Sequence, residues 1–165
     1  MIMPENDNVK IEEIELDSLN AVKATVGKIL AVDFGDARTG LAVSDVSRFL
    51  ASGIGVVAPG GIEKTAEAVA EVAREQGVSA IVVGLPVNMD GSEGSRAARY
   101  RKFACLLKAQ CALPVAMFDE RMTTMTASRY LNETNTRGKK RKSVIDTLSA
   151  QIILQNCLDR LKYMN

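Results

Sequence analysis

The sequence predicts an α/β domain built on a mixed five-stranded sheet with helices on both faces. Five short apolar runs, bounded by Gly, Pro or polar residues, are typical of buried strands. The first three runs follow one another with short turns between them, which favours an antiparallel meander. The later runs are separated by amphipathic helical patterns, which favour parallel pairing through helical crossovers.

The expected elements follow in the order β-β-β-α-β-α-β-α. Strands are predicted at 28–34, 39–44, 54–58, 80–85 and 114–118. Apolar residues at helical spacing predict helices from Ile62 until Gly77, over Ala97–Cys111, over Thr124–Leu131, and from about Ser143 to Leu161. The polar, basic residues 132–142 favour a mobile loop.

The length of 165 residues suits one domain with a real core. Residues 1–26 carry six acids and two lysines without a clear period, which predicts an acidic extension for which disorder is an open alternative. Residues 27–165 are then the folded domain. No apolar run approaches the roughly 20 residues that cross a bilayer, and no secretory signal is visible. Three cysteines without CxxC spacing predict free thiols, so we expect a cytoplasmic protein.

Charge and histidine content narrow the chemistry. The sequence has no His, which excludes His-based triads and most zinc sites. Residues 96–142 carry twelve Lys or Arg against three acids, although the net charge of the chain is only +1. Because local potential attracts a phosphate backbone, this stretch favours a nucleic-acid partner. With few aromatics and no Trp, recognition should depend on backbone and shape.

Three carboxylates in separate segments are the candidate catalytic and metal-binding residues. Asp33 ends the first apolar run, Glu120 follows the fifth, and Asp146 lies near the start of the last helical pattern. An acid at a buried strand end is costly unless it is paired or binds a cation. Converging at one sheet edge, the three would suit Mg²⁺ or Mn²⁺, as one or two ions, and such ions commonly hold phosphates.

Each acid also has a structural alternative. Asp33 could pair with Arg38 or Arg121. Neighbouring strand residues point to opposite faces, so only one of Asp119 and Glu120 can face the site; we favour Glu120, with Asp119 as support or as part of a surface ion cluster.

Asp146 has an alternative of its own. It fits position N3 of a capping box that begins at Ser143, yet it also heads the apolar face formed by Ala150, Ile153 and Cys157. The basic run 137–142 is either a solvated loop or a phosphate-binding segment beside the site.

Several stretches together resemble the bacterial YqgF family. They are Leu30–Asp45, which contains the sequence AVDFGDARTG, Val83–Ser92, Asp119–Thr124, and Lys139–Asp146. The resemblance extends from about Lys28 to Leu161. Members of this family are described as Holliday junction resolvases or pre-16S rRNA nucleases, with an RNase H-like fold related to RuvC resolvase.

The resemblance implies that Asp33, Glu120 and Asp146 are the catalytic acids, that Arg38 and Arg96 take part, and that the protein trims the precursor of small-subunit ribosomal RNA. In one respect the sequence departs from the wider RNase H pattern, because its fourth strand, Val82–Leu85, carries no acid. The catalytic acid that related nucleases carry on the fourth strand must then be replaced by Glu120, which follows the fifth strand.

We therefore expect a metal-dependent nuclease that acts on pre-16S rRNA or on the pre-ribosomal small subunit. The expected nucleic-acid-binding residues are Arg38, Arg96, Arg121, Lys139, Lys140, Arg141 and Lys142. The alternatives are an RNA-binding ribosome-assembly factor with vestigial catalysis, and a resolvase of four-way DNA. A nucleotide phosphotransferase fits less well. The turn after the first strand also resembles the phosphate loop of the actin and sugar-kinase superfamily, but that fold needs two lobes around its nucleotide, and this length allows one. Both a monomer and a weak dimer are compatible with the sequence.

Overall fold

The computed structural model describes residues 10–119 and 138–164, and a five-stranded sheet forms its centre. The strands are β1 (Ile29–Asp33), β2 (Thr39–Ser44), β3 (Ala51–Val57), β4 (Ala80–Leu85) and β5 (Val115–Asp119), and their order in the sheet is β3-β2-β1-β4-β5. β1, β2 and β3 pair antiparallel, whereas β1–β4 and β4–β5 pair parallel. The predicted mixed sheet is thus confirmed, and the carboxyl ends of β1, β4 and β5 meet at one edge.

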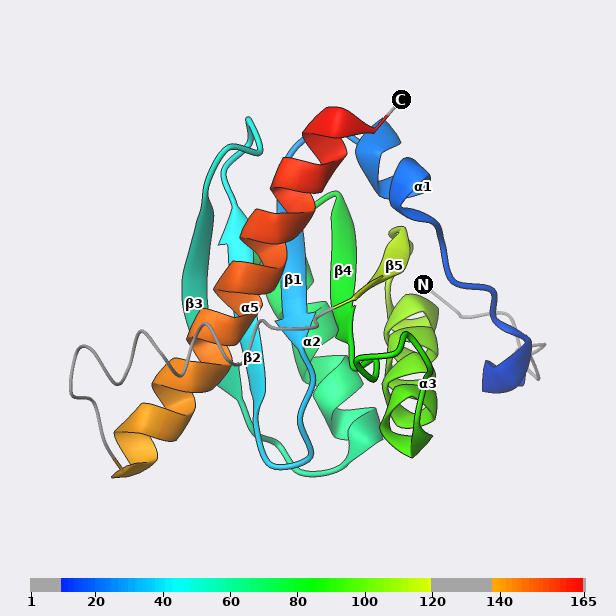
Figure 1. The fold of residues 1–165 in the computed structure, drawn as a ribbon, viewed down its shortest axis with the longest axis vertical. Coiled ribbons are helices and arrows are strands. Elements are labelled where there is room, and N and C mark those ends of the chain that lie inside the picture. Colours follow the sequence, from blue (N-terminus) through cyan, green and yellow to red (C-terminus); the bar gives the residue numbers. More distant parts are fainter. Residues whose placement is uncertain (1–9, 120–137, 165) are drawn as a thin grey trace.

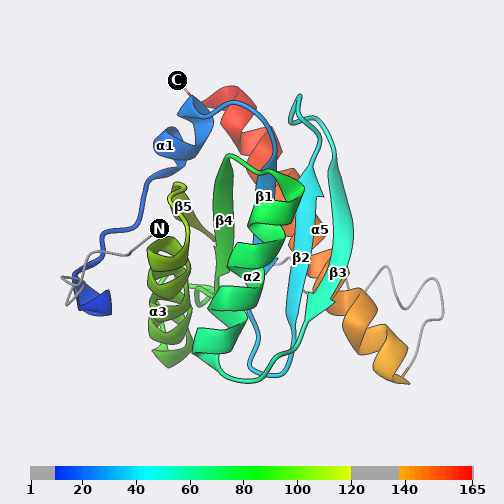
Figure 2. The ribbon, with the colours of Figure 1, turned by 180° about the vertical axis from the view of Figure 1, so that it is seen from behind.

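Helices cover both faces of the sheet. α2 (Ile62–Gln76) and α3 (Ser95–Gln110) lie on one face, and α5 (Gly138–Tyr163) crosses the other (Figures 1 and 2). Alternation along the strands divides the core accordingly. Leu30 and Val32 of β1 join the cluster under α2 and α3, while Ile29 and Ala31 join the cluster under α5.

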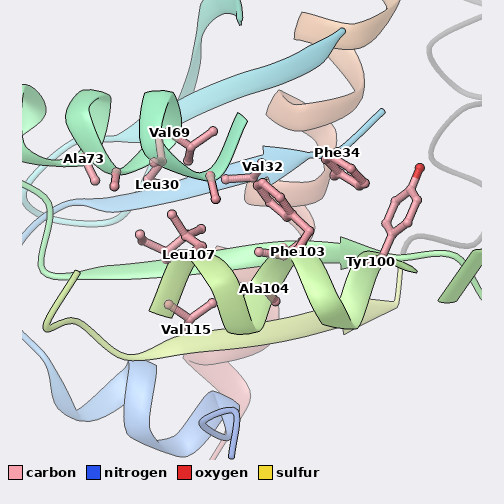
Figure 3. Packing of buried hydrophobic residues seen from close by; sticks show 14 of the residues in the cluster. Leu30, Val32, Phe34, Val69, Ala73, Tyr100, Phe103, Ala104, Leu107 and Val115 are labelled. Carbon is pink, nitrogen blue, oxygen red and sulfur yellow. The ribbon is translucent and has the colours of Figure 1, made fainter. Parts of the chain in front are cut away.

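An aromatic stack anchors the end of β1 to α3. The ring of Phe34 lies parallel to that of Phe103 with centroids 4.3 Å apart, and edge-on to Tyr100 at 5.1 Å (Figure 3). Phe103 is fully buried, and Phe34 nearly so. Because Phe34 directly follows Asp33, this packing fixes the backbone that carries the first candidate acid.

The last helix begins earlier than the sequence pattern suggested. α5 starts at Gly138, so residues 138–142 are helical and the predicted loop is wrong there. Lys and Arg have good helix propensity, and a run of charges without apolar periodicity conceals it. Ser143 therefore lies inside the helix, and the capping-box interpretation of Asp146 is wrong. The predicted helix over Thr124–Leu131 lies outside the described residues.

Residues 10–26 form an amino-terminal segment that packs on the domain. It contains a 3₁₀ turn, η1 (Ile11–Glu13), and a short helix, α1 (Leu19–Ala24), whose Val22 is fully buried. Asp17 forms an isolated parallel bridge with Ala116 of β5, and its N–H donates to the Val115 carbonyl at 2.9 Å. The later part of the expected extension thus covers the outer edge of β5; residues 1–9 lie outside the described part, and the boundary at residue 27 stays a prediction.

Arg48, in the turn between β2 and β3, contacts the carboxyl-terminal part of this segment. Its guanidinium donates to the Gly27 carbonyl and to Thr25 Oγ1, both at 2.6 Å, and to the Val22 carbonyl at 3.3 Å. The residue adopts a φ of 62°, which is uncommon outside glycine. Burial lowers the pKa of Arg48, and these carbonyl contacts satisfy the charge that burial removes from water.

The three cysteines are free, as expected. Cys105 and Cys157 are buried, and burial raises the pKa of Cys157 to about 12, so this thiol is a neutral core group. Within residues 10–119 and 138–164, no helix has the length and apolarity to span a bilayer.

Candidate active site

A polar pocket of about 190 Å³ lies at the carboxyl end of β1, between α3 and α5. Two of the three predicted acids, Asp33 and Asp146, line it together with two predicted arginines, Arg38 and Arg96. The remaining lining residues are Phe34, Gly35, Tyr100, Ile145 and Ser149. Elements far apart in the sequence therefore bring opposite charges to one small space.

Asp33 enters the pocket because β1 ends there. Its place in the strand alternation puts it on the same face as Ile29 and Ala31, which is the face that α5 covers. Across the antiparallel pair, Asp33 is in register with Gly40 of β2. The residue opposite Asp33 is thus one without a side chain, which leaves that face open to α5.

Asp146 reaches the pocket because two glycines let α5 approach the sheet closely. A Cβ on Gly40 would lie 2.0 Å from the carbonyl oxygen of Asp146. A Cβ on Gly53 of β3 would lie 2.5 Å from Cγ2 of Thr147. No ordinary contact is that short, so any side chain at Gly40 would force the helix backbone outward. Gly40 therefore sets how closely Asp146 approaches β2.

Arg38 contacts the second acid directly. Its Nε donates to Asp146 Oδ2 at 2.7 Å, and the two side chains are 31% and 23% exposed. The turn that carries Arg38 is tight, because a Cβ on Gly35 would lie 2.4 Å from the Arg38 carbonyl oxygen. Arg38 therefore lies at the pocket that also holds Asp33, with Asp146 as an ion-pair partner.

Arg96 enters from the first turn of α3. Its Nη2 donates to Tyr100 Oη at 3.0 Å, and its guanidinium carbon lies 5.5 Å from the centre of the same ring. Tyr100 therefore orients Arg96 at the pocket wall. The sequence offered a weak signal for this pair, since Arg96 and Tyr100 are four residues apart in a predicted helix.

A second arginine of α3 ties the β1–β2 turn to the helix. Arg99 Nε donates to Asp36 Oδ1 at 2.6 Å, and its guanidinium carbon lies 5.8 Å from the centre of the Phe34 ring. Both partners are largely exposed, so this ion pair adds little stability. The Arg99 guanidinium thus lies beside the pocket but does not line it.

The chain matches a protein-family model along most of its length. Residues 27–160 match the model described as "RuvX: Holliday junction resolvase". The chain belongs to the RuvX family. Similar curated members are named "putative pre-16S rRNA nuclease". One, from Pelotomaculum thermopropionicum, is 44% identical over 133 residues, which cover 80% of this chain and 86% of the relative.

Another relative with the same name, from Phenylobacterium zucineum, is 38% identical over 151 residues, covering 90% of this chain and 97% of the relative. Among solved structures, Thermus thermophilus RuvC in complex with a Holliday junction substrate superposes with a TM-score of 0.52 at 14% identity. The match covers 82% of this chain and 96% of that one. This likeness confirms the RuvC-related fold of the RuvX member.

Several predicted site residues are not tested by the described part of the chain. Glu120 and Arg121 lie outside it, as do the side chains of Lys139–Lys142, whose backbone forms the first turns of α5. Asp119, by contrast, is described at the end of β5. It lines a different pocket, with Leu19, Met117, Phe118 and Arg160, and is not among the residues around Asp33.

The donors present suit a hard divalent cation. Asp33 and Asp146 offer carboxylate oxygens in one pocket, and Mg²⁺ commonly takes one or two carboxylates and completes its shell with water and substrate oxygens. Within residues 10–119 and 138–164, no third acid, Cys or His joins them in a metal-binding group. These two carboxylates are donors of the kind that a hard divalent cation takes.

Proposed function

We propose that this RuvX family member is a metal-dependent nuclease that hydrolyses phosphodiester bonds in the precursor of 16S rRNA. The observation that carries the proposal is the gathering of Asp33, Asp146, Arg38 and Arg96 around one pocket at the carboxyl edge of β1. Carboxylates beside arginines are the pairing that phosphoryl chemistry needs, since one set holds a cation and the other neutralises phosphate.

The comparisons support the choice of substrate class. The matched family model is described as a Holliday junction resolvase, and the similar relatives carry the name of a pre-16S rRNA nuclease. Both names denote cleavage of a nucleic-acid backbone. Because the curated relatives, which match over most of both chains, carry the name of an RNA nuclease, we choose the ribosomal precursor, in the free RNA or in the pre-ribosomal small subunit, over the four-way junction.

In the proposed mechanism the acids and the arginines have separate tasks. Asp33, Asp146 and Glu120 would hold one or two Mg²⁺ or Mn²⁺ ions. The chemistry that such ions supply is activation of water and stabilisation of charge on the phosphate and leaving oxygens. Arg38 and Arg96 bind nonbridging phosphate oxygens, and Tyr100 keeps the Arg96 guanidinium oriented for that contact.

The basic segment at the start of α5 extends this phosphate-binding surface. Lys139, Lys140, Arg141 and Lys142, together with Arg121, would contact the backbone away from the scissile bond. We place the reaction in the cytoplasm, in keeping with three cysteines that are free rather than bridged. The protein acts as a monomer or a weak dimer.

A side-by-side cleavage assay tests the proposal. Wild type and Asp33→Asn are incubated with a 16S rRNA precursor fragment and with a four-way DNA junction, in Mg²⁺, in Mn²⁺ and in EDTA. We expect the wild type to cut the RNA in either metal, EDTA to abolish cutting, and Asp33→Asn to lose about 10² to 10⁴ in rate while keeping its circular dichroism spectrum.

Three outcomes would contradict the proposal. Wild-type rates in correctly folded Asp33→Asn would remove its catalytic basis. Cleavage of the junction alone would assign the activity to resolution. Tight, salt-sensitive RNA binding without cleavage in any metal would instead support an assembly factor with vestigial catalysis.

A further inference from the structure

The contact between Arg38 and Asp146 points to a coupling between nucleic acid and metal. The Arg38 guanidinium lies against a carboxylate that the proposed function assigns to a cation. A guanidinium and a divalent ion compete for the same carboxylate oxygens. Because both are positive, they repel each other when both lie against one carboxylate. This inference rests on the proposed function. It concerns whether Asp146 binds Arg38 or the cation, in the protein alone and in the complex with nucleic acid.

The backbone leaves little freedom to separate the two groups by moving the acid. The Asp146 carbonyl oxygen lies only 2.0 Å from where a Cβ on Gly40 would be, so α5 cannot shift toward β2, and β1 is anchored by Phe34 stacked on Phe103. Arg38, in contrast, stands at the end of a four-bond side chain that is 31% exposed. Freeing Asp146 is thus a matter of moving the arginine side chain.

A substrate phosphate provides the alternative partner for that side chain. Arg38 lines the same small pocket as Arg96, so a phosphate entering beside Asp33 comes within reach of both guanidinium groups. Arginine binds phosphate oxygens as well as it binds carboxylate, and its planar fork suits both. The exchange therefore replaces one ion pair with another and exposes the oxygens of Asp146.

We propose that Arg38 guards Asp146 in the nucleic-acid-free protein and transfers to a backbone phosphate when nucleic acid binds, so that the site takes up its divalent cation mainly together with substrate. By thermodynamic linkage, cation and nucleic acid then raise each other's affinity by the same factor. The coupling would keep a cation-loaded hydrolytic centre from forming without its substrate.

Calorimetric titration of the protein with Mn²⁺ alone tests the guard. Because the ion pair is partly buried and charge-assisted, we expect Arg38→Gln to bind Mn²⁺ about five- to tenfold more tightly than wild type. Arg99→Gln is the matched control, since it removes a neighbouring guanidinium that pairs with Asp36 and does not line the pocket. Its Mn²⁺ affinity should stay within about twofold of wild type.

The second measurement is the coupling itself. A fluorescently labelled 20-nucleotide RNA is titrated with protein, with and without Ca²⁺, and its integrity is checked on a gel. We expect Ca²⁺ to strengthen RNA binding by wild type and to have a smaller effect on Arg38→Gln. Equal enhancement in both proteins would overturn the guard, as would unchanged or weaker Mn²⁺ binding by Arg38→Gln, or an equal gain in Arg99→Gln.

These results separate the guard from the proposed function. If neither wild type nor Arg38→Gln binds Mn²⁺, the metal site itself fails and the guard fails with it. If Mn²⁺ binds and Asp33→Asn abolishes binding, but Arg38→Gln leaves the affinity unchanged, the site stands and the guard alone is wrong.

Discussion

The substitution Gly40→Ala perturbs the geometry of the site without changing any polar group. The new Cβ would lie 2.0 Å from the Asp146 carbonyl oxygen and 2.4 Å from its carbonyl carbon. A carbon and an oxygen approach to about 3.3 Å at closest, so the two must separate by about 1.3 Å. The obstacle is helix backbone, which cannot rotate out of the way as a side chain can.

The displacement has two measurable consequences. Overpacking of this kind costs about 1–3 kcal/mol, which lowers the melting temperature by about 2–12 °C for a chain of this size. A catalytic group misplaced by about 1 Å costs on the order of 10² in rate, so cleavage should fall by about that factor at a temperature where the variant remains folded.

The assay pairs a thermal melt with single-turnover RNA cleavage. Gly53→Ala is the control, because its Cβ would meet the Cγ2 methyl of Thr147 at 2.5 Å, and a side chain can give way more easily than backbone. We expect a smaller loss of both stability and rate there. A Gly40→Ala protein with the melting temperature and cleavage rate of wild type would refute the reasoning that this glycine sets the position of Asp146.

Three further predictions concern stability. Burial alone would raise the pKa of Asp17, but hydrogen bonds from Lys108 and the Val115 N–H, with the Lys108 charge, lower it overall. Its contribution is therefore complete above about pH 4 and lost as pH falls through the lowered pKa. In urea unfolding, Asp17→Asn should destabilise more at pH 6 than at pH 3, and a pH-independent difference would contradict this. Arg48→Ala should cost about 2 kcal/mol, because three carbonyl and hydroxyl contacts lose a charged donor; an unchanged urea midpoint would contradict it. Phe103→Ala should cost about 3–5 kcal/mol and leave Phe34 without its stacking partner, and a loss under about 1 kcal/mol would show that the core closes over the gap.

The arrangement of the sheet could be predicted because each strand carries its own signal. Continuous apolar runs marked β1 and β4 as buried strands, and the spacing between runs separated antiparallel from parallel pairing. The meeting of Asp33 and Asp146 followed from the same rules, since one ends a central strand and the other heads the apolar face of a helix. Features that depend on strand order and on the apolar face of a helix could therefore be predicted from the sequence.

Contacts that depend on tertiary approach could not be predicted in this way. The start of α5 was hidden because its first turns carry charges and no apolar stripe. The segment around Asp17 is held by a single bridge, by side-chain hydrogen bonds and by a few apolar contacts, such as those of Leu16 and Val22, and these leave no periodicity in the sequence. The partner of Arg38 was likewise undetermined, because it depends on how far α5 descends toward Gly40.

The amino-terminal segment also bears on how the protein stays dispersed in solution. Asp17 occupies hydrogen-bonding groups of Val115 that an outer strand would otherwise offer to other molecules. Unsatisfied outer strands are templates for aggregation. Since the family match begins at residue 27, a version trimmed to the matching portion would lose this cover together with the buried Val22, and it should precipitate at concentrations where the whole chain remains clear.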